Sequence, residues 1–119
     1  MKSIKKLEYD LHNYLYGDSN ESVYLMYNNN TDLYKIGITN NINRRLSQIK
    51  TQSGCEIDLI EYFHVCIFYG LDSKSIEEEL HKTYKKSRVV GEWFKFTEDE
   101  ADDCYCYMSD LCEFGIIRV

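Results

Sequence analysis

Proline is absent from the 119 residues of this chain, and glycine occurs only six times. A sequence so poor in both residues is not expected to contain a long flexible linker or a low-complexity segment. The length fits one domain, and a domain of this size buries enough apolar surface to fold without disulfides or structural metals. We therefore expect a single domain over residues 1–119.

Long apolar runs are also missing, so no segment has the length of a membrane span. The basic start, Met1 to Lys6, is not followed by the apolar segment of a signal peptide. We expect an intracellular protein, in cytoplasm or nucleus, without a membrane partner. The five cysteines are then expected to be free thiols, because the Cys104-x-Cys106 pair has no second pair at zinc-finger spacing.

The net charge of −6 argues at first against a nucleic-acid partner. Its distribution argues the other way, because residues 35–50 and residues 82–88 each carry four basic side chains and no acid. Residues 92–113 carry eight acids and one lysine. A basic middle and an acidic end predict a polyanion-binding face beside an acidic helix. The acidic helix is either a solvated surface or a surface for a protein partner.

Periodicity predicts helices over residues 3–16, about 41–52, 71 to about 86, and 98 to about 112, the last opened by a Thr97–Glu100 capping box. Strands are predicted over residues 23–27, 33–38, 57–69 and 91–96, with alternate apolar residues of 57–69 on one face. The fold class is therefore α/β (α+β): a small three-stranded antiparallel sheet flanked by helices, with an extra C-terminal short strand and helix. Its parts are an N-terminal helix (1–21), a core (22–96) and an acidic C-terminal helix and tail (97–119).

Helical phase separates neighbouring charged residues. At about 100° per residue, Arg45 flanks the apolar stripe of its helix, whereas Arg44 points away from it. In the following helix Glu78 points away from the stripe, and Glu77 and Glu79 flank it on opposite sides. Phase alone does not choose between these last two glutamates.

An ordered set of short motifs runs through residues 22–96: Ser22-Val23-Tyr24, Lys35-Ile36-Gly37, Arg45, Glu77 three residues before a leucine, His81, and Gly91-Glu92-Trp93-Phe94. The set resembles the GIY-YIG nuclease superfamily, in the branch common in phages and large DNA viruses. Ser22-Val23-Tyr24 stands where that family carries Gly-Ile-Tyr, and Lys35-Ile36-Gly37 where it carries Tyr-Ile-Gly. A hairpin loop centred on residues 29–30 places Tyr24 directly opposite Lys35.

The resemblance implies a Mg²⁺-dependent endonuclease that hydrolyses DNA phosphodiester bonds. Glu77 would hold Mg²⁺ or another divalent metal, Arg45 would stabilise the phosphate, and Tyr24 would act on the attacking water. Lys35 and His81 complete the expected catalytic set. The partner is DNA, and a protein partner for targeting is left open. Six exposed cations are expected to contact DNA: Arg44, Lys50, Lys82, Lys85, Lys86 and Arg88.

Three positions depart from the family pattern. Ser22 replaces a glycine, Lys35 replaces the second tyrosine, and Val89 and Val90 lie near the place of a late asparagine. Lys35 acts as a base only in its neutral form, which burial beside Arg45 favours; otherwise it contacts phosphate. Two alternative functions follow: a catalytically impaired nucleic-acid-binding domain, or a protein-interaction module that uses the acidic helix.

Overall fold

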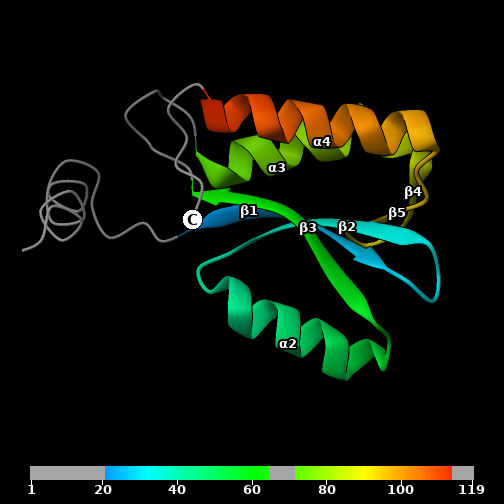
Figure 1. Ribbon diagram of the computed structural model, residues 1–119. Coiled ribbons are helices and arrows are strands. Elements are labelled where there is room, and N and C mark those ends of the chain that lie inside the picture. Colours follow the sequence, from blue (N-terminus) through cyan, green and yellow to red (C-terminus); the bar gives the residue numbers. More distant parts are fainter. Residues whose placement is uncertain (1–20, 65–71, 114–119) are drawn as a thin grey trace, which may run out of the picture.

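A computed structural model describes residues 21–64 and 72–113 of the chain. Its centre is an antiparallel five-stranded sheet in the order β3-β1-β2-β5-β4. The strands are β1 (Ser22–Asn28), β2 (Leu33–Thr39), β3 (Ile57–His64), β4 (Arg88–Val90) and β5 (Trp93–Phe94). Helices α3 (Ser73–Thr83) and α4 (Glu98–Glu113) cover one face of the sheet, and α2 (Ile42–Ser53) covers the other (Figure 1). The mixed α+β class is confirmed.

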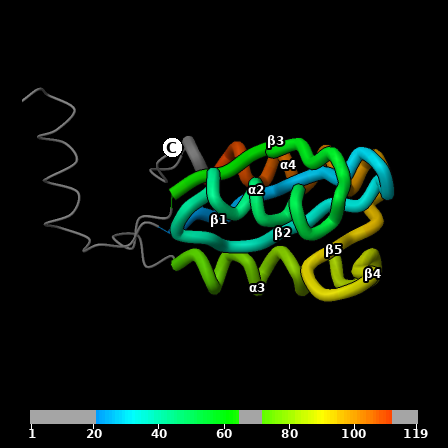
Figure 2. Tube along the Cα trace, turned by 90° about the horizontal axis from the view of Figure 1, so that it is seen from below, coloured from blue at the N-terminus to red at the C-terminus, as the bar shows by residue number. Residues whose placement is uncertain are grey.

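The expected sheet of three strands is wrong, because β4 and β5 extend it beyond β2. Trp93 pairs with Lys35, and Phe94 pairs with Tyr34. The backbone N–H of Ile36 continues this ladder by donating to the carbonyl of Glu92 at 3.2 Å. Figure 2 shows α3 running beside the remaining part of β2, which β5 does not cover.

The hairpin register differs from the expected one by two residues. Tyr24 pairs with Gly37, and Lys35 pairs with Met26. The reason lies in the turn, where the side-chain oxygen of Asn28 accepts from the backbone N–H groups of residues 30 and 31 at 2.9 and 3.2 Å. The loop therefore spans residues 29–32 and ends on Asp32 with a φ of 60°. A shift of two residues leaves every side chain on its predicted face.

Strand β3 contains a bulge that the sequence pattern did not reveal. Leu25 pairs with Glu61, but the next residue of β1 pairs with Leu59, so one residue of β3 is extra. A bulge of this kind turns the following side chains to the opposite face. Ile57 therefore packs under α2, whereas Phe63 packs under α3 and α4, and the prediction that they share a face is wrong.

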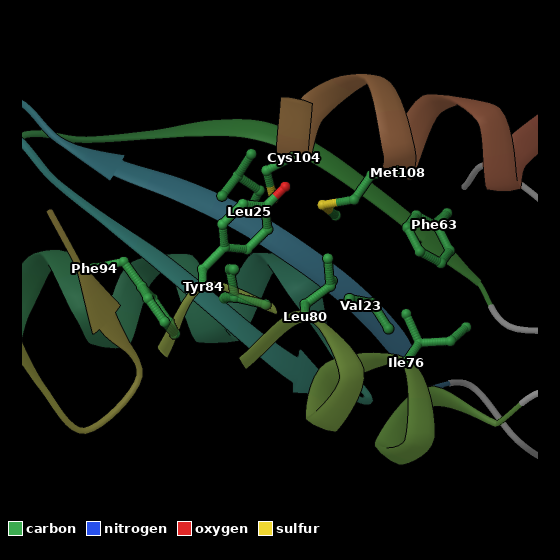
Figure 3. Close-up of a cluster of buried hydrophobic side chains, with 10 residues drawn as sticks. Val23, Leu25, Phe63, Ile76, Leu80, Tyr84, Phe94, Cys104 and Met108 are labelled. Atoms are coloured by element: carbon green, nitrogen blue, oxygen red, sulfur yellow. The ribbon is translucent and has the colours of Figure 1, made fainter. Parts of the chain in front are cut away.

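Two apolar clusters hold the layers together. The larger one fills the space between the sheet and the α3–α4 layer; Figure 3 shows nine of its side chains by name: Val23, Leu25, Phe63, Ile76, Leu80, Tyr84, Phe94, Cys104 and Met108. The smaller one lies under α2 and consists of Tyr24, Met26, Ile49 and Ile57. Because β1 alternates between the clusters, it is the strand that places a tyrosine beneath α2.

Local signals set both ends of α2 and the start of α4. Helix α3 ends at Thr83, before the expected end near residue 86. Asn41 caps α2 by accepting from the N–H of Arg44, and Gly54 ends that helix at a φ of 65°. Thr97 and Glu100 form the expected capping box, with reciprocal bonds of 3.1 Å. Within the described residues, no helix is both long and apolar enough to cross a bilayer. The predicted helix 3–16, residues 65–69 of the third strand and the tail after residue 113 lie outside the described residues.

Candidate active site

Tyr24 lies in the centre of the sheet and is 1% exposed. Its ring extends across β2 to rest above Gly37, the residue with which it pairs. A Cβ at position 37 would collide with the Tyr24 hydroxyl oxygen, lie 2.6 Å from its Cζ and 3.0 Å from Oε2 of Glu92. Gly37 is therefore required by close approach rather than by backbone conformation. It leaves the space in which a phenol and a carboxylate meet above one strand.

Lys35 lies on the same face of β2, two residues before this glycine. Its Nζ is 3.0 Å from Oε2 of Glu92 and 5.2 Å from the centre of the Trp93 ring. The Lys35 side chain is 15% exposed and that of Glu92 41%. These contacts hold the Lys35 side chain between the Glu92 carboxylate and the Trp93 ring.

Glu92 is the site residue that sequence reasoning missed. It was noted only as part of a motif and was not among the expected site residues, yet its carboxylate contacts Lys35 and lies over Gly37. The turn before β5 positions it, because Gly91 adopts a φ of 54° and the Glu92 carbonyl is bound by Ile36 N–H. The available signal was its place in Gly91-Glu92-Trp93-Phe94, directly before a strand that pairs with Lys35.

Glu77 extends from α3 toward the same region. Its Oε2 is buried and has no hydrogen-bond partner. Burial raises the pKa of the Glu77 carboxyl, and the negative charge of Glu92 raises it further, while His81 and Lys35 act in the opposite direction. A buried carboxylate oxygen without a donor is costly for the fold. Such an atom is suited to accept a cation or a proton from a ligand.

His81 follows one turn later on α3 and is turned toward the β2 backbone. Its Nε2 donates to the carbonyl of Ile36 at 2.9 Å, and its ring meets Phe94 edge-on at 4.9 Å. This bond fixes α3 to the part of β2 that β5 leaves open. His81 therefore helps to hold Glu77 in place, and its charge reaches that carboxyl.

The two arginines of α2 lie on different sides of the helix, as their phase predicted. Burial raises the pKa of Tyr24, and the positive charge of the exposed Arg45 partly offsets that rise. Arg44 donates to Asn40 at 3.3 Å and lines a shallow depression on the outer face of α2. Of these two arginines, Arg45 is the one that affects the pKa of the Tyr24 hydroxyl.

The charged groups of the site affect the pKa values of Tyr24 and Glu77. Burial raises the pKa of the Tyr24 hydroxyl above its ordinary value of 10.0, with further increases from Glu92 and Glu77 and an opposing effect from Arg45. The phenol is therefore neutral at physiological pH. The fold brings Tyr24, Lys35, Arg45 and Glu77 together from four different elements, and adds Glu92.

The cations expected to contact DNA are all exposed and form two groups. Arg44 and Lys50 lie on α2. The other four follow one another from the end of α3 through a 3₁₀ turn (Lys85–Ser87) into β4: Lys82, Lys85, Lys86 and Arg88. The second group thus leads to the sheet edge next to β5.

Comparison with known proteins assigns this arrangement to a family. The family model of the T5orf172 domain matches residues 21–109, a range that contains every site residue described above. The chain belongs to the T5orf172 domain family. T5orf172 domains are associated with phages and related to nuclease-like folds of the HNH and GIY-YIG kinds.

A viral relative of this T5orf172 domain is the uncharacterized protein 460R of Invertebrate iridescent virus 6. The two are 39% identical over 64 residues, which is 54% of this chain. The match covers 28% of the viral protein, so this chain corresponds to a minor part of its relative. No solved structure matches the chain.

Proposed function

We propose that this T5orf172 domain is a Mg²⁺-dependent endonuclease that hydrolyses DNA phosphodiester bonds through a GIY-YIG-like site. The observation that carries the proposal is the convergence of Tyr24, Lys35, Arg45 and Glu77, which are far apart in sequence, around Gly37 and the tyrosine ring that covers it. Phosphodiester hydrolysis needs a group that takes a proton from water, positive charge at the phosphate and help for the leaving group. These four residue types match that list.

Each side chain has a proposed role that follows from its surroundings. Arg45 is exposed and would bind the phosphate of the substrate with its planar fork. Lys35, held by Glu92 and Trp93, would add a second fixed positive charge. Tyr24 would hydrogen-bond the attacking water and, after releasing its own phenolic proton to solvent, would receive the proton of that water. The positive charge of a bound divalent ion would favour that release by lowering the pKa of the Tyr24 hydroxyl, in the same direction as the effect of Arg45.

Glu77 is the residue that would hold the metal. Its buried, unpartnered Oε2 fits a ligand atom whose partner is supplied from outside the fold. Magnesium commonly takes one or two carboxylates from a protein and completes its shell with water and phosphate oxygens. Within residues 21–64 and 72–113, no cluster of three or more potential metal-ligating side chains is present. When bound, the ion would supply charge stabilisation for the phosphate oxygens and the leaving group.

Matched arginine and glutamate variants test this proposal. Glu77→Gln and Arg45→Met should each reduce Mg²⁺-dependent nicking of supercoiled plasmid by at least about 100-fold, the usual scale for loss of a charge-stabilising group. Arg44→Met removes the neighbouring charge on the same helix, and should change nicking by less than about fivefold. Glu78→Gln removes the neighbouring charge on α3, and as the control for Glu77→Gln it should also change nicking by less than about fivefold. Equal losses from target and control variants would refute the site assignment.

The ion pair between Lys35 and Glu92 favours a second candidate, a DNA-binding domain that does not cut. A paired lysine in place of a tyrosine leaves one fewer group able to act on water. This candidate predicts DNA affinity that falls steeply with salt concentration and is not accompanied by nicking when Mg²⁺ is added.

A further inference from the structure

We propose that Val89 and Val90 form an apolar wedge that enters duplex DNA and unstacks a base step beside the candidate active site. The inference rests on the proposed function for its DNA partner and adds a substrate class: duplexes with a weakened base step, such as a mismatch or a bulge. Cations precede the wedge along the chain and would contact the adjoining phosphates.

Val89 and Val90 stand out by exposure. Their side chains are 56% and 63% exposed, higher than any other exposed large apolar side chain of the described residues. They lie on β4, the outermost strand of the sheet. Arg88 pairs with Phe94 and Val90 with its neighbour Trp93, so Val89 is the extra residue of a bulge. Bulges at sheet edges re-aim side chains, and here two successive valines stay in solvent.

The surroundings of the wedge are positively charged. Lys82, Lys85, Lys86 and Arg88 precede the valines, and residues 82–91 contain no acid. Three acids lie close to this segment, and each is bonded to a group other than its cations. Asp103 accepts from the Tyr84 hydroxyl at 2.6 Å. Glu100 accepts from Ser87 at 2.7 Å and from the N–H of Thr97, and Glu92 pairs with Lys35. The cations around the wedge are thus available to an incoming polyanion.

The wedge is also continuous with the candidate site. Lys35 pairs with Trp93 across β2 and β5, and Trp93 pairs with Val90 across β5 and β4. Residues paired directly across strands project to the same face, and neighbouring strands lie about 4.8 Å apart. Val90 therefore lies on the site's face of the sheet, about 10 Å from Lys35 along this row. One DNA duplex would therefore contact Lys35 through a phosphate and Val90 through a base step at the same time.

Duplex DNA fits this surface better than a lipid bilayer or a second protein strand. Proteins that insert apolar side chains between base pairs combine a few such side chains with adjacent cations. A bilayer surface instead requires an extended apolar face, and two valines do not provide one. A three-residue edge strand is also short for pairing with another chain.

Fluorescence of a duplex with 2-aminopurine next to a mismatch tests the wedge, because this base brightens when it is unstacked. The titration is done in chelator, so that binding is measured without cutting. The full chain should raise the fluorescence, and Val89→Thr/Val90→Thr should lose most of that rise and bind about tenfold more weakly. Val89→Ile/Val90→Ile should retain both. Ile60→Thr, an exposed apolar residue 39% accessible on the opposite edge strand, is the matched control and should behave as the parent.

The outcomes separate this inference from the proposed function. If the parent binds the duplex and the threonine variant binds and brightens it equally, the wedge is refuted and DNA binding stands. If the parent binds neither intact nor mismatched duplex, both the wedge and the proposed function fall. Binding to anionic phospholipid vesicles in place of DNA would also overturn the wedge.

Discussion

Replacing Gly37 by alanine tests whether Tyr24 rests on β2 as described. The added Cβ would lie 2.6 Å from Cζ of the tyrosine ring, well inside normal contact. The ring is 1% exposed and packs with Met26, Ile49 and Ile57, so it has little room to move. The Glu92 carboxylate, 3.0 Å from the added atom, is the easier group to displace because it is partly exposed.

Two effects of opposite sign determine how much Gly37→Ala changes the free energy of unfolding. Overpacking a tight site costs about 1–3 kcal/mol. Alanine in place of glycine returns roughly 0.4–1 kcal/mol by restricting the unfolded chain, because Gly37 does not need a positive φ. The clash is the larger effect, so Gly37→Ala should lower the free energy of unfolding by about 1–2 kcal/mol. For a chain of this length that corresponds to a fall in Tm of roughly 3–12 °C.

A double-mutant cycle isolates the contact between the Tyr24 ring and residue 37. Thermal or urea unfolding is measured for the parent, Gly37→Ala, Tyr24→Ala and the double variant. Removing the ring removes the clash, so alanine at position 37 should be neutral or stabilising when Tyr24 is absent. A coupling free energy of at least about 1 kcal/mol is expected for residues in direct contact. Strictly additive effects of the two substitutions would refute the stacking of Tyr24 on this strand.

Two further predictions concern stability. Glu77→Gln should raise the free energy of unfolding at neutral pH, because burial raises the pKa of the Glu77 carboxyl. This gain should shrink as the pH falls through the raised pKa and vanish below about the ordinary value of 4.5. Urea unfolding measured over pH tests this prediction, and a gain seen only in acid would contradict it. Thr97→Ala removes one half of the capping box and should cost about 1 kcal/mol, whereas Thr51→Ala, an exposed threonine within α2, should cost less; equal losses would remove the capping contribution.

Local chemistry made the helix ends and strand faces predictable. Asn41, Gly54 and the Thr97–Glu100 pair act within one turn of the chain, so their effect is legible in a short stretch of sequence. The faces of β1 and β2 follow from alternation, which a register error of two residues does not disturb.

Features that depend on distant partners were missed. The bulge in β3 appears only when its pairing with β1 is known, and the extension of the sheet depends on Trp93 meeting Lys35. Glu92 becomes part of the site through that same pairing, because the turn before β5 carries its carboxylate to Lys35 and Gly37. Tyr34, the neighbour of Lys35 on β2, lies on the opposite face of the sheet and stacks on Phe96 at 5.3 Å.

Supercoiled plasmid incubated with the purified chain, in Mg²⁺ and in excess chelator, tests the central claim most directly. The proposed site predicts conversion to nicked circles in Mg²⁺, loss of that conversion in chelator, and its loss in Glu77→Gln with Mg²⁺ present. Plasmid that stays supercoiled in Mg²⁺, with DNA bound throughout, would contradict catalysis. Nicking that persists in Glu77→Gln at the parent's rate would contradict the site.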